Sequence, residues 1–355
     1  MIYYVIMSFL LLYGLLFQGS PLHHFKINLK GIFILFSILL ICFAGFRYGL
    51  EADYFAYKEI FFAPSQSMIV ERYEPGFKLF INAYKSIISV DNFNGFVFIF
   101  AFISMGLKCL YFSRLKNGII ALFVYFSLMF VMMEMNGIRQ GIATSFLFFA
   151  FEEAKKRKLI QFILFVLLAS SFHISSLIFL PVYYIVRHQI SVRKIVFFVI
   201  LTLMANLFIV PVTMSILEKI QIPSFKLYIL MIKSHLLNGS SGKIVTIGGI
   251  RRLVILLLFV LLEEKKRFYN PYFNVYLTGS LMYLLFMGNE TMAGRMSMSF
   301  EVFAAPFIAN LSGKYSWKKI YVLLAYLFLC ILLFITLLSH SPNAIPYQTY
   351  LWEAR

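Results

Sequence analysis

The chain has 355 residues, of which 61% are hydrophobic and 13% charged, and its formal net charge at pH 7 is +17. This apolar content is greater than a soluble domain of this length requires, so an ordinary soluble enzyme is excluded. The basic surplus could suggest a nucleic-acid partner, but its distribution along the chain indicates a membrane protein instead.

Long apolar stretches recur from one end of the chain to the other, with lengths that suit helices crossing a hydrocarbon core of roughly 30 Å. The first stretch lacks the basic flank and small-residue cleavage site of a signal peptide, so it is predicted to be a membrane helix. We therefore predict an all-α, polytopic integral membrane helix bundle with both termini outside. Its twelve membrane segments are expected near 1–17, 31–46, 93–112, 118–133, 137–153, 159–171, 174–186, 194–216, 246–262, 272–288, 299–311 and 318–339.

Two features depart from a plain helical bundle. The stretch 159–186 is too long for one span, is interrupted at 170–173 and has basic residues at both ends, which predicts two short helices or a re-entrant hairpin. Two long outer loops, at about 47–92 and 217–246, are expected to carry helices that lie in the membrane surface. No repeat or soluble region interrupts the pattern, so a single integral membrane domain over 1–355 is predicted.

Short basic loops alternate with the apolar stretches. On one side of the membrane these loops hold 17 Lys and Arg residues against four glutamates, while the charges on the other side are mixed. This is the asymmetry of cytoplasmic loops, so most of the basicity is an orientation signal and no nucleic-acid partner is expected. The basic loop residues are Lys26, Lys30, Arg114, Lys116, Lys155, Lys156, Arg157, Lys158, Arg187, Arg193, Lys194, Lys265, Lys266, Arg267, Lys314, Lys318 and Lys319.

Several common catalytic motifs are missing from the sequence. It contains no G-x-x-x-x-G-K-[ST] loop, no G-x-S-x-G elbow and no H-E-x-x-H helix. Asp53 and Asp91 are the two aspartates, so there is no D-x-D pair to hold the divalent ion of a sugar nucleotide. The three cysteines are dispersed in apolar runs. We expect no metal and no cofactor, and arginines could supply the positive charge that the chemistry needs.

The first long outer loop carries two candidate motifs. Arg47 could bind a phosphate with two parallel hydrogen bonds. Tyr48, Tyr54 and Tyr57 could stack on sugar rings, although an interfacial aromatic belt is the structural alternative. Asp53 lies among them as a possible proton acceptor or a partner of Arg47. Farther on, Glu74 precedes Pro75 and Gly76, where it could be a general base or a helix cap.

Later outer positions carry further cationic candidates. Arg139 and Gln140 fall in the first turn of a membrane helix, where unpaired N–H groups and the helix dipole favour an anion; structural anchoring is the alternative. His173 lies at a helix break and could be a base, a phosphate-binding donor or a cap. Arg295 follows Gly294 at the start of a late segment. Arg251 at the outer end of a span is a lower-ranked candidate, since it could be an interfacial anchor.

In order and in outer location these motifs resemble those of the EpsG/Wzy group of exopolysaccharide and O-antigen polymerases. The first motif departs from the group at Glu51, where the group has glycine, and at Ala52, where it has a small hydroxyl residue. The matching positions are Arg47, Tyr48, Asp53, Tyr54 and Tyr57; Glu74, Gly76 and Phe77; Arg139, Gln140 and Ala143; Phe172, His173 and Ser175; and Gly294 with Arg295.

The resemblance implies a GT-C-like membrane glycosyltransferase in the bacterial inner membrane, with its active site facing the periplasm or exterior. It would transfer a growing glycan from undecaprenyl pyrophosphate to another lipid-linked repeat unit, with a chain-length regulator as a possible partner. Arg139, Arg295, Arg47 and Gln140 would bind the pyrophosphate, and His173, Glu74 or Asp53 would take the proton of the acceptor hydroxyl. Tyr48, Tyr54, Tyr57 and Arg251 would bind the glycan.

Three other functions fit a cationic, multi-spanning membrane protein. A flippase for lipid-linked oligosaccharides should spread its charges through the bundle rather than gather them at outer helix ends. An O-antigen ligase shares the leaving group and the arginines and differs in its acceptor. A membrane O-acyltransferase would place a histidine near the centre of the bundle, and His173 keeps that alternative open.

Overall fold

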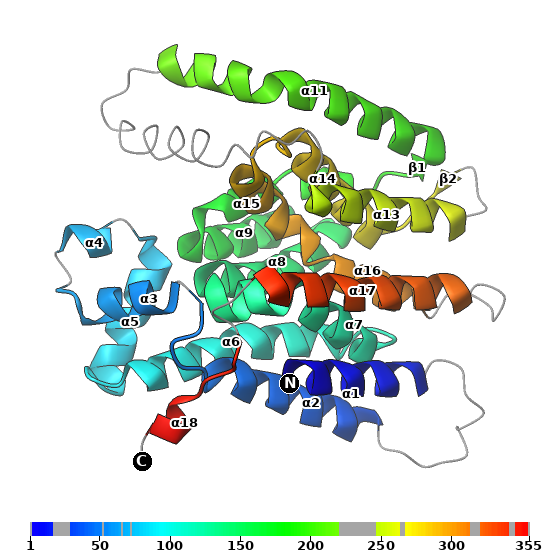
Figure 1. Cartoon of the computed structure of the whole chain (residues 1–355). Coiled ribbons are helices and arrows are strands. Elements are labelled where there is room, and N and C mark those ends of the chain that lie inside the picture. The colour runs from blue at the N-terminus through cyan, green and yellow to red at the C-terminus, as the bar shows by residue number, and fades with distance from the viewer. Residues whose placement is uncertain are drawn as a thin grey trace. The chain divides into compact units, whose positions relative to one another are not determined.

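The computed structural model describes residues 2–16, 29–51, 53–64, 67–71, 73–219, 246–262, 267–312, 320–340 and 345–353. The regular elements of these residues are helices apart from one pair of two-residue strands (Figure 1). The all-α prediction is confirmed. Most of the predicted outer loop 217–246 lies outside the described residues. By their internal contacts the residues group into two compact units, Met1–Leu180 with Ala304–Arg355, and Pro181–Phe303. The single-domain prediction stays a prediction, and each unit is described by itself.

The first unit contains the N-terminal helices and the last part of the chain. A π-helix, η2, and a 3₁₀-helix, η3, interrupt its α-helices. Its elements are α1 (Ile2–Leu16), α2 (Leu29–Gly45), α3 (Asp53–Phe62), α4 (Met68–Glu71), α5 (Pro75–Ile87), α6 (Phe93–Phe112), α7 (Gly118–Tyr125), η2 (Phe126–Asn136), α8 (Ile138–Lys155), α9 (Leu159–Phe172), η3 (Ile174–Phe179), α16 (Ala304–Ser312), α17 (Ile320–His340) and α18 (Tyr350–Glu353).

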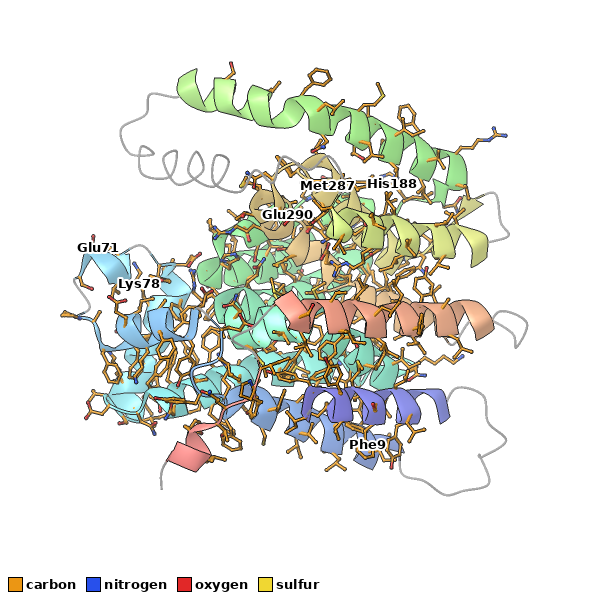
Figure 2. The ribbon with its side chains drawn as sticks, in the orientation of Figure 1. Phe9, Glu71, Lys78, His188, Met287 and Glu290 are labelled. Atoms are coloured by element: carbon orange, nitrogen blue, oxygen red, sulfur yellow. The ribbon has the colours of Figure 1, made fainter. Side chains whose placement is uncertain are left out.

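Two helices of the described chain are long and apolar enough to cross a membrane. They are α6, with a mean hydropathy of 1.9, and the continuous stretch of α7 and η2, with a mean hydropathy of 2.0. Shorter apolar helices include α1, α2, α9 and α17. Some of them expose large apolar side chains, such as Phe9 of α1 at 50% (Figure 2), which suits contact with lipid. Twelve membrane segments and a GT-C architecture remain predictions.

The loop at 47–92, predicted to be an outer loop, folds onto the first part of α6. In Figure 1, α3, α4 and α5 form a group beside that helix. Pro75 begins α5, a position where its missing N–H removes no helical bond. The ring of Phe77 lies 6.2 Å from Phe96 and 5.8 Å from Phe100, between ring centroids. The apolar face of α5 is therefore buried against α6, and its start, which carries Glu74, is held in place.

The stretch 159–186 breaks where the sequence indicates. Helix α9 ends at Phe172, His173 is extended with φ −153° and ψ 109°, and η3 begins at Ile174. The 118–153 region breaks at Gly137. Before it, η2 continues α7 as a π-helix up to Asn136, and after it α8 starts at Ile138. A π-helix in a chain is uncommon and often accompanies a functional site.

The second unit contains α10 (Val182–Ile185), β1 (Ile190–Ser191), α11 (Val192–Lys219), α13 (Ile247–Leu262), β2 (Arg267–Phe268), α14 (Pro271–Leu285) and α15 (Glu290–Glu301). The two strands pair antiparallel, with Ile190 opposite Phe268. Asn270 and Asn289 cap α14 and α15 by accepting hydrogen bonds from first-turn N–H groups.

The prediction of one segment over 299–311 is wrong. Helix α15 ends at Glu301 and α16 begins at Ala304. The reason is Pro306, which has no N–H to donate to the carbonyl of Val302 and so cannot continue a helix from α15. Within the first turn of α16 the same proline is tolerated, because no helical bond is lost there.

Candidate functional site

Glu74 is the centre of a polar cluster in the first unit. It occupies the position before α5 with extended backbone angles, φ −65° and ψ 149°, as expected for a residue that precedes proline. Its side chain makes no capping hydrogen bond with α5. The carboxylate is therefore available to other parts of the chain, and the helix-cap alternative is not the arrangement found.

The two oxygens of the Glu74 carboxylate face two different helix starts. Oε2 forms an ion pair with Nη1 of Arg139, at the beginning of α8. Oε1 accepts a hydrogen bond of 3.2 Å from the backbone N–H of Ile174 and lies 3.5 Å from Nδ1 of His173. The side chains of Glu74, Arg139 and His173 are 13%, 21% and 19% exposed. Three residues from distant parts of the sequence thus form one cluster that is accessible to a ligand.

Close backbone packing brings these segments together. A Cβ atom on Gly76 would lie 2.4 Å from Oγ and 2.7 Å from the carbonyl oxygen of Ser171, near the end of α9. A Cβ atom on Gly141 would lie 2.4 Å from the carbonyl oxygen of Met133 in η2. Because only glycine fits at either point, the start of α5 can approach His173 and the start of α8 can pack on η2.

Aromatic side chains surround the Arg139 guanidinium. Its Cζ lies 4.4 Å from the centre of the Tyr73 ring and 5.8 Å from that of Phe77. Such cation–π contacts favour a planar, charged guanidinium. It also hydrogen-bonds to the hydroxyl of Tyr57. Burial raises the pKa of Tyr57 to about 12, although the nearby Arg139 opposes this, and burial likewise raises the pKa of Tyr73.

Glu74 is ionised at neutral pH. Burial by itself would raise the pKa of its carboxyl group. The imidazole of His173, the guanidinium of Arg139 and the backbone N–H groups of Glu74 and Ile174 outweigh burial and hold the pKa at about 2. A carboxylate of this pKa is a weak proton acceptor, so in this arrangement Glu74 can orient its two neighbours better than it can act as a general base.

Several polar atoms near this cluster have no hydrogen-bond partner among the described residues. They are Nε of Arg139, Nε2 of Gln140, and the Oγ atoms of Ser175 and Ser176. Buried polar groups are normally paired, so a set of unpaired ones calls for an explanation. They lie at the start of α8 and around the start of η3, where helix N-termini favour an anion. A ligand with several anionic oxygens could satisfy them.

Asp53 lies at the edge of this region. It begins α3, and its backbone N–H donates a hydrogen bond of 3.3 Å to Oδ1 of Asn136, three residues before Arg139. Its negative charge contributes to raising the pKa of Tyr57 and Tyr73, which contact Arg139. The structure thus places Asp53 near the cluster, and its predicted role as a base remains a prediction.

The rest of the first motif is largely used in packing. Arg47 is 1% exposed and donates a hydrogen bond of 2.6 Å to the carbonyl oxygen of Ala44, in the last turn of α2. Tyr54 is 1% exposed and its hydroxyl donates to Oδ1 of Asn94 at 3.0 Å. Its ring also packs on that of Tyr48, at 5.8 Å between centroids. Burial leaves Arg47 and Tyr54 without a surface for substrate, which does not support their predicted binding roles.

Glu51 occupies a backbone conformation that suits the glycine of the motif it departs from. Its φ is +64°, in the left-handed region that favours glycine, and Gly49 has a φ of +61°. The chain therefore keeps the conformation that glycine would adopt most readily, even though a glutamate stands at the position.

The sequence pattern missed one buried ion pair. Nζ of Lys108 in α6 lies 2.8 Å from Oε1 of Glu134 in η2, with 0% and 2% of the two side chains exposed. The same amine donates to the carbonyl oxygen of Gly141 at 2.6 Å and to Oγ of Ser145 at 2.7 Å. These bonds link α6, η2 and the start of α8, and they support the backbone next to Arg139. An isolated lysine inside an apolar run was the signal that could have found it.

The second unit has its own cationic cluster. Glu301 forms ion pairs with Arg251, at 3.1 Å, and with Arg252. Arg252 is 2% exposed, donates to the carbonyl oxygen of Gly248 at 2.7 Å and lies over the ring of Tyr283. These contacts tie α13 to α14 and α15. Arg295 is exposed on α15. The predicted roles of Arg251 and Arg295 toward substrate remain predictions.

Comparison with known proteins identifies a family. The family model described as the EpsG family matches residues 30–349. The comparison with curated proteins and that with solved structures each found no match. The matched range includes every residue of the Glu74 cluster and of both ion-pair clusters described above.

Proposed function

The chain belongs to the EpsG family, and on that premise we propose that it is a membrane-embedded polysaccharide polymerase. It would transfer a glycan from a lipid pyrophosphate, undecaprenyl pyrophosphate in bacteria, to a hydroxyl group of another lipid-linked repeat unit. The family and the apolar helices are consistent with a membrane protein. We place the reaction on the outer face of the inner membrane, because the basic loops predict that the Glu74 cluster is on the opposite side.

One observation carries the proposal. Glu74, Arg139 and His173, which are far apart in the sequence, meet with their side chains partly exposed. Around them are donors that have no partner in the part of the chain that the structure describes. In glycosyl transfer from a pyrophosphate, positive charge stabilises the leaving group and a base can take the proton of the acceptor hydroxyl, and Arg139 and His173 can supply these two functions. Both touch the same carboxylate.

Arg139 would bind the pyrophosphate. A guanidinium has five N–H donors, of which Glu74 and Tyr57 use some, while Nε has no acceptor among the described residues. As the bond between the sugar carbon and the pyrophosphate oxygen breaks, the oxygen keeps the electron pair and Arg139 stabilises the added charge. Gln140 and the start of η3 would offer further donors.

His173 would be the general base. Its Nδ1 faces the Glu74 carboxylate, so the tautomer with hydrogen on Nδ1 leaves Nε2 as the proton acceptor. Nε2 would take the proton of the acceptor hydroxyl while that oxygen bonds to the sugar carbon. Glu74 would hold the imidazole in place and stabilise the imidazolium that forms. Because the carboxylate itself is a weak base, we assign proton transfer to His173 and orientation to Glu74.

The first test is a gel of surface glycan from cells that lack the protein. The deletion should leave lipid-capped single repeats, and the wild-type chain should restore a ladder of long chains. Arg139→Ala should reach the membrane in normal amount and make no ladder. Arg114→Ala, which removes an arginine from a predicted cytoplasmic turn, is the matched control and should behave as wild type.

Other results would assign another function. If Arg139→Ala makes long chains at normal abundance, the pyrophosphate role of that residue is wrong. Absence of repeats from the outer face in the deletion would indicate a flippase. Polymer that forms in the deletion but stays on its lipid carrier would indicate an O-antigen ligase, and a change in glycan mass by an acyl group would indicate an O-acyltransferase.

A further inference from the structure

A cavity of about 690 Å³ lies in the first unit at the far end of α6 from Glu74. It is lined by residues of the first turns of α2, by the last turn of α6 and by the start of α7. Phe77 beside Glu74 packs near Phe96, whereas the cavity touches Cys109 and Ser113. At 1.5 Å per residue these two regions are separated by roughly 20 Å along α6. The cavity is therefore distinct from the Glu74 cluster.

The walls of the cavity are apolar. Ile34 and Ile38 of α2 and Leu110 of α6 line it, and they are 55%, 54% and 49% exposed. Both helices are apolar, and α6 is long enough to span a membrane. Large aliphatic side chains that remain half exposed around a concave space suit a hydrocarbon chain.

The mouth of the cavity is cationic. Lys30 and Lys116 are exposed and line it together with Asn117 and Gly118, at the start of α7. First-turn N–H groups of a helix have no acceptor inside that helix, and the dipole places positive charge there. Asn117 satisfies one of them by accepting from Ile120 at 3.2 Å. The described residues that line the cavity include no acid. Its polar end thus suits a phosphate.

We infer that this cavity binds one anionic glycerophospholipid from the surrounding membrane. Its phosphate would lie against Lys30, Lys116 and the start of α7, and an acyl chain would lie between α2 and α6. The volume falls within the range of about 300–1,000 Å³ that is usual for small-molecule sites. Basic pockets between membrane helices on the cytoplasmic side bind anionic headgroups, and both lysines belong to loops predicted to be cytoplasmic. The inference rests on the membrane placement proposed above and not on the polymerase reaction.

Lipid binding to the purified full chain in mild detergent tests the headgroup contacts. Phosphatidylglycerol and phosphatidylcholine with the same acyl chains are titrated, and bound lipid is counted by native mass spectrometry. We expect phosphatidylglycerol to bind more tightly to wild type. Lys30→Gln and Lys116→Gln should each weaken it by about five-fold, and the double variant by about 25-fold. The control pair Lys156→Gln and Lys158→Gln removes two exposed lysines outside the cavity and should change binding by less than about two-fold.

Filling the cavity tests the acyl-chain contact and does not depend on the lysine variants folding. Ile38→Trp places a larger side chain in the lining, and Leu39→Trp changes a neighbour on α2 that does not line the cavity. We expect binding to fall by about ten-fold in the first variant and to remain unchanged in the second.

Three results would overturn the inference. They are equal affinity for the two lipids, equal weakening by the control lysine pair, and wild-type binding by Ile38→Trp. Lipid binding is measured without glycan, so its result can be interpreted even if the polymerase assay shows no activity.

Discussion

Two of the ion pairs in the first unit, Lys108 with Glu134 and Arg139 with Glu74, have different surroundings. Lys108 and Glu134 are almost fully buried, and the amine also has three other acceptors, in Ser104, Gly141 and Ser145. Arg139 and Glu74 are partly exposed, Glu74 also faces His173, and several donors beside them have no partner among the described residues. Protein atoms satisfy the hydrogen-bonding groups of the first pair. The second pair lies beside donors that a ligand could satisfy.

This difference separates a structural role from a functional one. A buried ion pair that loses one member leaves an uncompensated charge, which destabilises the fold strongly. A partly exposed pair is worth less to stability, because water can replace its partners. We therefore expect changes at Lys108 to act mainly on folding and changes at His173 to act mainly on activity. The predictions below test that division.

The largest effect is expected at His173. His173→Gln keeps a polar side chain of similar size but cannot take up a proton at neutral pH, so the rate of polymerisation should fall by about 10²–10⁴-fold. The rate is measured with purified protein in lipid nanodiscs and lipid-linked repeat units, by chain length against time. His188→Gln, which changes a histidine of the second unit (Figure 2), is the control and should keep the wild-type rate. A fully active His173→Gln would instead support a packing role.

The next effect is expected at Lys108. Lys108→Met leaves Glu134 buried without its cation and should lower the free energy of unfolding by about 3–5 kcal/mol. SDS titration of the purified protein in mixed micelles measures this. Adding Glu134→Leu removes the unpaired charge and should recover much of the loss. Lys158→Met, at an exposed lysine, should stay within about 0.5 kcal/mol of wild type.

A dependence on acid should come from Glu74. Its ordinary pKa of 4.5 is lowered to about 2 in the folded chain, where it faces Arg139, His173 and Tyr73. Ionised Glu74 therefore stabilises the fold fully above about pH 5, and this contribution is lost as the pH falls from there toward 2. SDS titrations across that range should show a smaller decrease in the free energy of unfolding for Glu74→Gln than for wild type. Glu71→Gln, at an exposed carboxylate of α4 (Figure 2), should keep the wild-type slope.

The smallest effect is expected at Glu51, outside both ion pairs. Glu51→Gly removes the steric strain of a left-handed backbone conformation at residue 51, so it should raise the free energy of unfolding by about 1 kcal/mol. Polymerisation should be unchanged. The same micelle titration measures the free energy of unfolding, and the glycan gel measures polymerisation. Glu59→Gly, in the interior of α3, is the opposite case and should destabilise by about 1 kcal/mol. Destabilisation by Glu51→Gly would show that the contacts of the Glu51 carboxylate stabilise the fold by more than the backbone strain destabilises it.

Much of the helical architecture could be predicted from the sequence. Pro75 and the break at His173 have local signals, and α6 coincides with the predicted segment. The break at Pro306 was missed, because the run 299–311 is apolar enough to resemble one span. Periodicity also did not reveal η2, since a π-helix depends on packing rather than on a local motif.

The site could be predicted only as a set of separate candidates. Sequence order indicates that Glu74, Arg139 and His173 are outer residues, but it contains no distance, and their meeting depends on close approach at Gly76 and Gly141. Tyr54 was predicted to bind the glycan, but its side chain is buried, because an aromatic ring can pack in a protein core as well as stack on a sugar. The partner of Lys108 lies 26 positions away on another helix, where no local pattern connects them.

The π-helix η2 affects how this region can tolerate insertions and deletions during evolution. A residue added to or removed from an α-helix turns everything beyond it by about 100°. The wider turns of η2 contain extra residues compared with an α-helix over the same rise, and α8 begins two positions after it. Loss of one residue from η2 could instead be absorbed when a wide turn returns to α-helical geometry, which would leave Arg139 beside Glu74. Related chains in which η2 differs in length should thus be aligned by the position of the cluster rather than by residue count.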